Sequence, residues 1–333
     1  MDRNPGLWLA VAVIVVIFLA VQLGALALVE PLKAAGFQPV ENPQNPVNPL
    51  LYVLAILVMT GVMLAAFRYD AAWTIRALIV LTGVYIAWIV FAMLVPPVVT
   101  LPVAGGIHVL AWAGAIALGV GLLVYPEWWV IDAAGVVMGA GAAGMFGITF
   151  GVLPALVLLS ILAVYDAISV YGTEHMLTLA SGVMDLNVPV VLVAPTTRGY
   201  SFLTDDEPIG DEQHEDGATT GEDDVDDPLE ERDALFIGLG DAVIPTVLVA
   251  SVAFFAPTSV PTVGLGTVSI ALPAITAMAG TFAGLAVLLT MVLQGRAHAG
   301  LPLLNGGTIA GYLLGALAVG LSVVEALGLS PYL

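Results

Sequence analysis

Long apolar runs constrain the fold of this chain more than any other feature. A run of about 18 residues or more is long enough for an α-helix to cross the hydrocarbon core of a bilayer. With 60% hydrophobic and only 10% charged residues, the chain is too apolar for a soluble globular protein. We therefore expect an all-α polytopic membrane protein with nine transmembrane helices. The expected spans are residues 7–29, 50–67, 75–95, 104–125, 129–151, 153–173, 234–256, 266–293 and 300–324.

Acidic residues are concentrated in one long segment between the sixth and seventh runs. Residues 204–233 hold 15 of the 26 acidic residues and one of the seven basic ones. Such a self-repelling, apolar-poor tract is expected to be disordered, and its charge disfavours nucleic acid as a partner. We expect three parts: helices 1–6 in residues 1–173, a cytoplasmic loop in 174–233 with a short strand-like run at 188–194, and helices 7–9 in 234–333.

The basic residues predict the orientation in the membrane. With nine spans, six of the seven fall on the side of the N-terminus, and only Lys33 falls on the other. Because cytoplasmic loops are enriched in Lys and Arg, the N-terminus and the 174–233 loop are expected to be cytoplasmic, with the C-terminus outside the cell membrane. The six are Arg3, Arg68, Arg76, Arg198, Arg232 and Arg296.

The chain has no cysteine and only four scattered histidines, so we expect no metal and no cofactor. His108, in the fourth span, is more typical of a packed or capping imidazole than of a metal ligand. Asp132 follows two tryptophans near a predicted membrane face and is expected at the interface.

Two further acids lie inside apolar runs, where a carboxylate is costly and requires a polar partner. Asp166 lies six residues before the end of span six, about 9 Å at 1.5 Å per residue. Asp241 lies six residues after the start of span seven, which runs in the opposite direction. The two carboxyls are therefore expected at the same depth and able to form a pair.

A contacting pair of carboxyls cannot readily ionise at both members, so it is expected to share one proton. This is the requirement for aspartic proteolysis, in which one acid activates water and the other protonates the leaving nitrogen. Gly238 and Gly240 remove side chains just before Asp241, which allows a substrate backbone to approach. The alternative is a proton-coupled transporter or channel using the same acids, although no inverted repeat is evident.

The pattern Tyr165-Asp166 on one span and Gly238-Leu239-Gly240-Asp241 on the next resembles the presenilin and signal peptide peptidase family of intramembrane aspartyl proteases. At the start of span nine, Pro302-Leu303-Leu304 stands where that family has Pro-Ala-Leu. A prepilin-type peptidase also has a GxGD stretch, but the proline element argues against it.

The resemblance implies an aspartic endopeptidase of the GxGD type that cleaves transmembrane helices of membrane proteins in the bilayer. It implies Asp166 and Asp241 as catalytic residues, and the proline element as a segment that shapes the active site and contacts substrate. By the same analogy, substrates are single-span proteins with their N-termini outside. Residues 190–193 are then expected to pair with the unwound substrate as an added strand.

Overall fold

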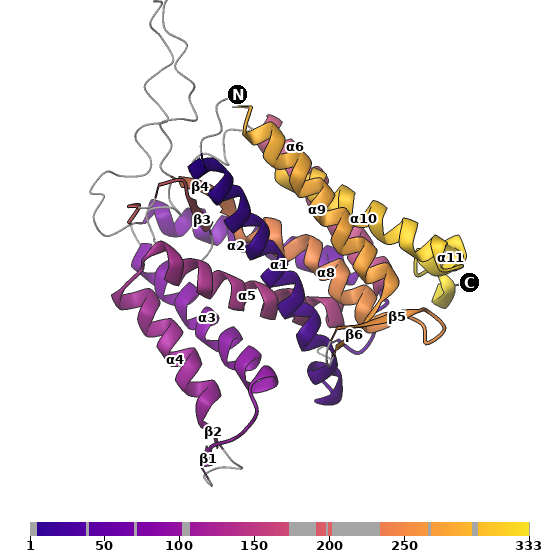
Figure 1. Ribbon diagram of the computed structural model, residues 1–333, viewed down its shortest axis with the longest axis horizontal. Coiled ribbons are helices and arrows are strands. Elements are labelled where there is room, and N and C mark those ends of the chain that lie inside the picture. The colour runs from indigo at the N-terminus through magenta and orange to yellow at the C-terminus, as the bar shows by residue number, and fades with distance from the viewer. Residues whose placement is uncertain are drawn as a thin grey trace, which may run out of the picture.

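The part of the chain that the structure describes is mostly helical (Figure 1). A computed structural model describes residues 5–37, 40–69, 72–101, 107–172, 191–197, 199–201, 234–265, 268–294 and 299–332. The acidic tract at 204–233 and four of the arginines used for the orientation, Arg3, Arg198, Arg232 and Arg296, lie outside these residues. The helices are α1 (Pro5–Ala34), α2 (Asn48–Arg68), α3 (Ala72–Leu94), α4 (Val109–Val124), α5 (Trp128–Thr149), α6 (Val152–Gly172), α8 (Leu239–Phe255), α9 (Leu272–Val292), α10 (Gly300–Ala318) and α11 (Val323–Ala326), followed by a 3-10 turn at Ser330–Tyr332.

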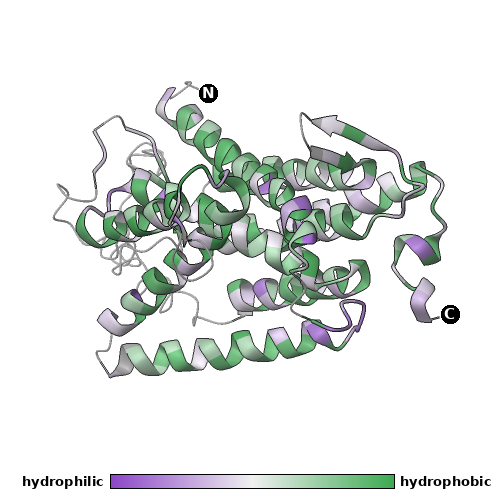
Figure 2. Cartoon of the chain, turned by 90° about the horizontal axis from the view of Figure 1, so that it is seen from below, coloured by the Kyte–Doolittle hydropathy of each residue, from purple (hydrophilic) through white to green (hydrophobic). Residues whose placement is uncertain are grey.

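Helix length and composition agree with a membrane protein. Among the described residues, seven helices are long and apolar enough to cross a membrane: α1, α2, α3, α5, α6, α9 and α10. Two apolar helices, α4 and α8, are shorter. These nine helices follow the order of the nine predicted spans, and hydrophobic residues make up much of their length (Figure 2). The chain is therefore a helical, multi-pass membrane protein, while nine complete crossings stay a prediction.

Three short antiparallel strand pairs accompany the helices. They are β1 (Thr100–Leu101) with β2 (Ile107–His108), β3 (Val191–Pro195) with β4 (Ala234–Gly238), and β5 (Thr262–Leu265) with β6 (Val268–Ala271). Strands β4 and β6 occupy the beginnings of two predicted spans, so α8 and α9 start later than expected. A short apolar run does not distinguish a strand from a helix, and here the pairing with β3 and β5 satisfies the backbone of these residues.

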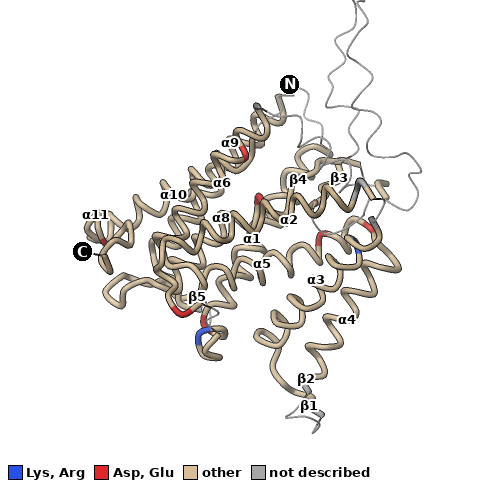
Figure 3. The backbone as a smooth tube through the Cα atoms, turned by 180° about the vertical axis from the view of Figure 1, so that it is seen from behind, with Lys and Arg blue, Asp and Glu red and all other residues tan. Residues whose placement is uncertain are grey.

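Helix α1 runs through the middle of the molecule and packs against α5 and α8 (Figure 1). Helices α3 and α4 pair on one side of it, and α6, α9 and α10 lie on the other. Charged residues are sparse along the described helices (Figure 3). The acids within the bundle therefore stand apart from a largely apolar framework.

Helices α9 and α10 approach each other closely along a seam of glycines. A Cβ atom added at any of these positions would lie 1.8–2.3 Å from an atom of the facing helix. Small residues at such spacing allow the backbones of membrane helices to come into contact. The seam holds the start of α10 in a defined position, and its members are Gly280, Gly284, Gly307, Gly311 and Gly315.

Candidate active site

Asp241 lies in the first turn of α8. The sequence predicted a helix from residue 234, with the acid two turns inside it, but β4 ends at Gly238 and the helix begins only at Leu239. The unpaired N–H groups at a helix N-terminus give it a partial positive charge, which stabilises a carboxylate there. The half-buried Asp241 therefore has an electrostatic reason for its position.

Asp166 lies on α6 and is buried, with 8% of its surface exposed. Its Oδ2 accepts the backbone N–H of Leu301 at 3.0 Å. Leu301 is the second residue of α10, whose N-cap residue, Ala299, makes no side-chain cap hydrogen bond. Asp166 thus satisfies one of the N–H groups that the start of α10 leaves without a partner, and both acids are associated with helix N-termini.

The first turn of α10 contacts both acids. A Cβ atom added to Gly300 would lie 3.3 Å from the Cγ and both carboxyl oxygens of Asp241, while the next residue, Leu301, donates to Asp166. Two consecutive residues of α10 thus each lie against one of the two carboxyls. The structure therefore brings together the two acids that the sequence singled out, with α10 beside them.

A second polar contact fastens α10 to α6. The amide Nδ2 of Asn305 donates to the backbone carbonyl of Leu159 at 2.9 Å, and Asn305 is fully buried. Leu159 lies seven residues before Asp166 and Asn305 lies four after Leu301, so both contacts join the same two helix faces. Sequence reasoning missed Asn305, whose signal was an amide inside a predicted span.

Comparison with known families and structures gives the context for this geometry. Residues 15–321 match the family model described as "Signal-peptide peptidase, presenilin aspartyl protease". The chain belongs to this family. It is an intramembrane aspartyl protease, and its substrates are membrane proteins within the bilayer. Neither the match nor the structures described next support the transporter or channel alternative.

Two solved structures of a presenilin family intramembrane aspartate protease resemble the chain. In the C222 crystal form the identity is 34% and the TM-score 0.60, with 91% of this chain and 97% of that chain covered. In the P2 crystal form the identity is 33% and the TM-score 0.59, with 91% and 96% covered. A search of curated proteins found no match.

The residues around Asp241 differ in what they contact in the protease. A Cβ atom on Gly238 would lie 3.5 Å from Oδ2 of Asp241, whereas one on Gly240 would meet nothing within 4 Å. The side chain of Leu239 faces α5, because its Cδ1 would lie 3.1 Å from a Cβ atom on Gly139. Gly240 therefore marks an open side of the acid, and Leu239 anchors it to α5.

The proline element occupies the first turn and a half of α10. Pro302 lies in the first turn, where its missing N–H removes no helical hydrogen bond. Leu304 is fully buried, and the carbonyl of Leu303 lies against Gly284 on α9. These three residues pack α10 against its neighbours, while Gly300 and Leu301, just before them, make the contacts with the acids.

Two other residues near the acids have defined positions. Tyr165 is 43% exposed, although it is adjacent to Asp166 in the sequence. Pro245, four residues after Asp241, has no N–H to donate, so the backbone carbonyl of Asp241 lacks its helical hydrogen bond. The protease thus keeps a backbone acceptor beside the carboxyl of Asp241.

The strand-like run predicted after α6 is a strand where it is described, and one of its edges is paired within the chain. β3 pairs along one edge with β4, with Val193 opposite Phe236. At its other edge, the N–H of Val193 donates to Oδ1 of Asp132 at 2.8 Å. The second edge of β3 thus carries one hydrogen bond to α5, and the pairing of residues 190–193 with substrate stays a prediction; residue 190 lies outside the described residues.

Asp132, the fifth residue of α5, is buried within the protein, with 7% of its surface exposed, while its depth at the membrane interface stays a prediction. His108 accepts the N–H of Ala111 at 3.2 Å as the N-cap of α4, which confirms its capping role. The described residues contain no group of three or more His, Cys, Asp or Glu side chains able to hold a metal.

Proposed function

We propose that Asp166 and Asp241 are the catalytic pair of this protease, which is then of the GxGD type. The observation that carries the proposal is the contact of one helix start with both acids: Leu301 donates to Asp166, and Gly300 lies against the carboxyl of Asp241. Two interacting carboxyls in a poorly solvated place hold one proton between them, as aspartic proteolysis requires.

The reaction follows from that shared proton. The ionised carboxylate takes a proton from water as the water oxygen bonds to the scissile carbonyl carbon, and the protonated carboxyl gives its proton to the carbonyl oxygen. The tetrahedral intermediate then collapses. Its hydroxyl returns a proton to the second acid, that acid protonates the nitrogen, and the C–N bond breaks. The pair ends with one proton, as it began, and no cofactor takes part.

The substrate must be unwound where it is cleaved, because helical hydrogen bonds occupy and shield its carbonyls. In an antiparallel pair, the N–H and C=O of one residue point to the same side. Since the N–H of Val193 points away from β4, the backbone groups of its partner Phe236 point away from β3. We infer that an unwound substrate adds to this outer edge of β4, close to Asp241, rather than to β3.

The orientation is proposed from the distribution of basic residues. The N-terminus and the loop at 174–233 are cytoplasmic, the C-terminus is outside the cell membrane, and water reaches the acids from the cytoplasmic side. Residues 1–173 and 234–333 then form the two groups of transmembrane helices that this loop connects. Substrates with one span and an external N-terminus fit this orientation.

The test is cleavage of a labelled transmembrane peptide in detergent or liposomes, with products identified by mass spectrometry. We expect Asp166→Asn and Asp241→Asn each to lower kcat by about 10³-fold or more, because an amide neither takes nor gives the proton. Thermal unfolding should change little, since asparagine keeps an acceptor oxygen. Full hydrolysis by either variant would refute the assignment.

The matched control is Glu325→Gln, which removes a solvent-exposed carboxylate on α11. It should leave cleavage unchanged. A transition-state inhibitor of aspartyl proteases should block the wild-type enzyme and the control equally. Ion flux through liposomes without cleavage would instead favour the transporter.

A further inference from the structure

A third acid, Asp132, is buried in the first two turns of α5 and takes no part in the proposed chemistry. Its Oδ1 accepts the N–H of Val193, and no hydrogen-bond partner of its Oδ2 is found among the described residues. A buried carboxylate is costly in an apolar surrounding, so one that is retained there indicates a specific role.

The contact joins α5 to the strand pair β3–β4, and β4 leads directly into α8. Val193 on β3 lies opposite Phe236 on β4, and β4 ends at Gly238, three residues before Asp241. Through this ladder, the position of β3 sets the position of the start of α8. Asp132 is therefore linked to the proposed catalytic acid through Val193 of β3 and the neighbouring strand β4.

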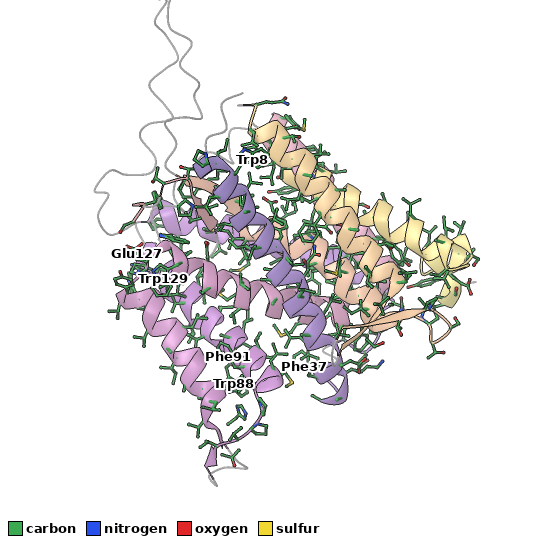
Figure 4. All side chains as sticks on the ribbon, viewed as in Figure 1. Trp8, Phe37, Trp88, Phe91, Glu127 and Trp129 are labelled. Carbon is green, nitrogen blue, oxygen red and sulfur yellow. The ribbon has the colours of Figure 1, made fainter. Side chains whose placement is uncertain are left out.

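A second carboxylate on the same end of α5 holds the same segment. Glu127, the N-cap of α5, accepts a hydrogen bond from the hydroxyl of Ser201 and is 5% exposed. Figure 4 places Glu127 near the part of the molecule that carries β3 and β4 in Figure 1. The start of α5 thus contacts the segment after α6 at two points, Val193 and Ser201.

Apolar side chains also pack against β3. Leu192 and Ala194 pack in one cluster with Phe18 of α1 and Leu304 of α10. Such packing is not directional, and because residues 192–195 are buried on both faces of β3, a slip by one residue would exchange one apolar face for the other. The bond from Asp132 to one particular N–H supplies the direction and register that apolar contacts leave undetermined.

We propose that Asp132 is a positioning residue, which holds the β3–β4 strand pair in register so that Asp241 meets Asp166. The proposal rests on the catalytic role proposed for Asp241. Asp132 does not touch the reacting atoms; it acts through Val193 and β4.

The test compares Asp132→Leu, which removes the acceptor while keeping the branching and the number of heavy atoms, with Asp132→Asn, which keeps an acceptor oxygen. We expect Asp132→Leu to lower kcat by about 10- to 100-fold, the effect of misplacing a reacting group by about 1 Å. Asp132→Asn should stay within about threefold of wild type. Hydrogen exchange of the amides in β3 and β4 should quicken in Asp132→Leu and not in Asp132→Asn.

A second variant removes the same bond from the donor side. Val193→Pro deletes the N–H that faces Asp132 and leaves the ladder with β4 its hydrogen bonds, because that N–H points away from β4. It should reproduce the loss of kcat, and the double variant should be no worse than the single ones by more than about twofold. Val193→Pro also supplies the measurement if Asp132→Leu fails to fold.

Three outcomes would overturn the proposal. Full kcat in Asp132→Leu, with faster exchange of the amides in β3 and β4, would show that register does not govern catalysis. Loss of activity in Asp132→Asn, with exchange unchanged, would show that the acidic proton matters instead. Additive losses in the double variant would mean that the two residues act separately. Asp241→Asn in the same assay distinguishes these results from failure of the catalytic assignment, because only that failure leaves Asp241→Asn active.

Discussion

Replacing Gly284 on α9 by alanine tests whether the position of α10 controls the acids. An added Cβ atom would lie 2.3 Å from the carbonyl oxygen of Leu303 and 2.9 Å from its carbonyl carbon. Ordinary contact begins at 3.4 Å, so the shortfall is about 1 Å. The obstacle is backbone, which no side-chain rotation relieves, and α10 must therefore move.

The displacement reaches the acids because Leu303 is only two residues from Leu301. A shift of about 1 Å would stretch the 3.0 Å contact between Leu301 and Asp166 beyond hydrogen-bond range. We expect kcat to fall by about 10²-fold. Overpacking should lower the free energy of unfolding by about 1–3 kcal/mol, offset by about 1 kcal/mol from the higher helix propensity of alanine.

Gly306→Ala on α10 is the matched control, because a Cβ atom there meets nothing within 4 Å. It has the same gain in helix propensity and should keep wild-type kcat, with thermal stability equal or higher. Cleavage of a fluorogenic transmembrane peptide and the melting temperature are measured for both variants. A Gly284→Ala enzyme with kcat within twofold of wild type would refute the argument that α10 positions the acids.

Other variants test single contacts of the site. Gly300→Val places a branched side chain against the carboxyl of Asp241 and should abolish cleavage and weaken binding of a transition-state inhibitor; unchanged inhibitor affinity would contradict the contact. Asn305→Leu removes the donor to the Leu159 carbonyl and should lower the free energy of unfolding by about 1–2 kcal/mol, measured by thermal unfolding, with a parallel loss of kcat. Tyr165→Phe should keep kcat, since this partly exposed side chain has a packing role; a loss above tenfold would give its hydroxyl a part in catalysis.

Several features of the fold were predictable because they depend on local composition. Helices occur at all nine apolar runs, since a backbone in lipid must satisfy its own hydrogen bonds. The acids Asp166 and Asp241 stood out because a carboxylate inside an apolar run is costly wherever it occurs. Their meeting was also predictable, as consecutive antiparallel spans placed them at one depth.

The first residues of span seven were predicted wrongly, because β4 is as apolar as a helix would be. Its partner β3 lies about 40 residues earlier in the sequence, and hydropathy carries no information about such pairing. The burial of Asp132 could not be predicted for the same reason: its partner, the N–H of Val193, is 61 residues away.

The sequence by itself determined that this protein is a helical membrane protein with two costly acids on consecutive helices, because hydrocarbon penalises charge and unpaired backbone regardless of the neighbours. Only the tertiary structure decided that the first turn of α10 lies beside both acids, and that Asp132 binds β3, the partner of the strand that precedes Asp241. These contacts use backbone N–H groups, which every residue but proline possesses. Which of them meets a carboxylate depends on how the helices pack.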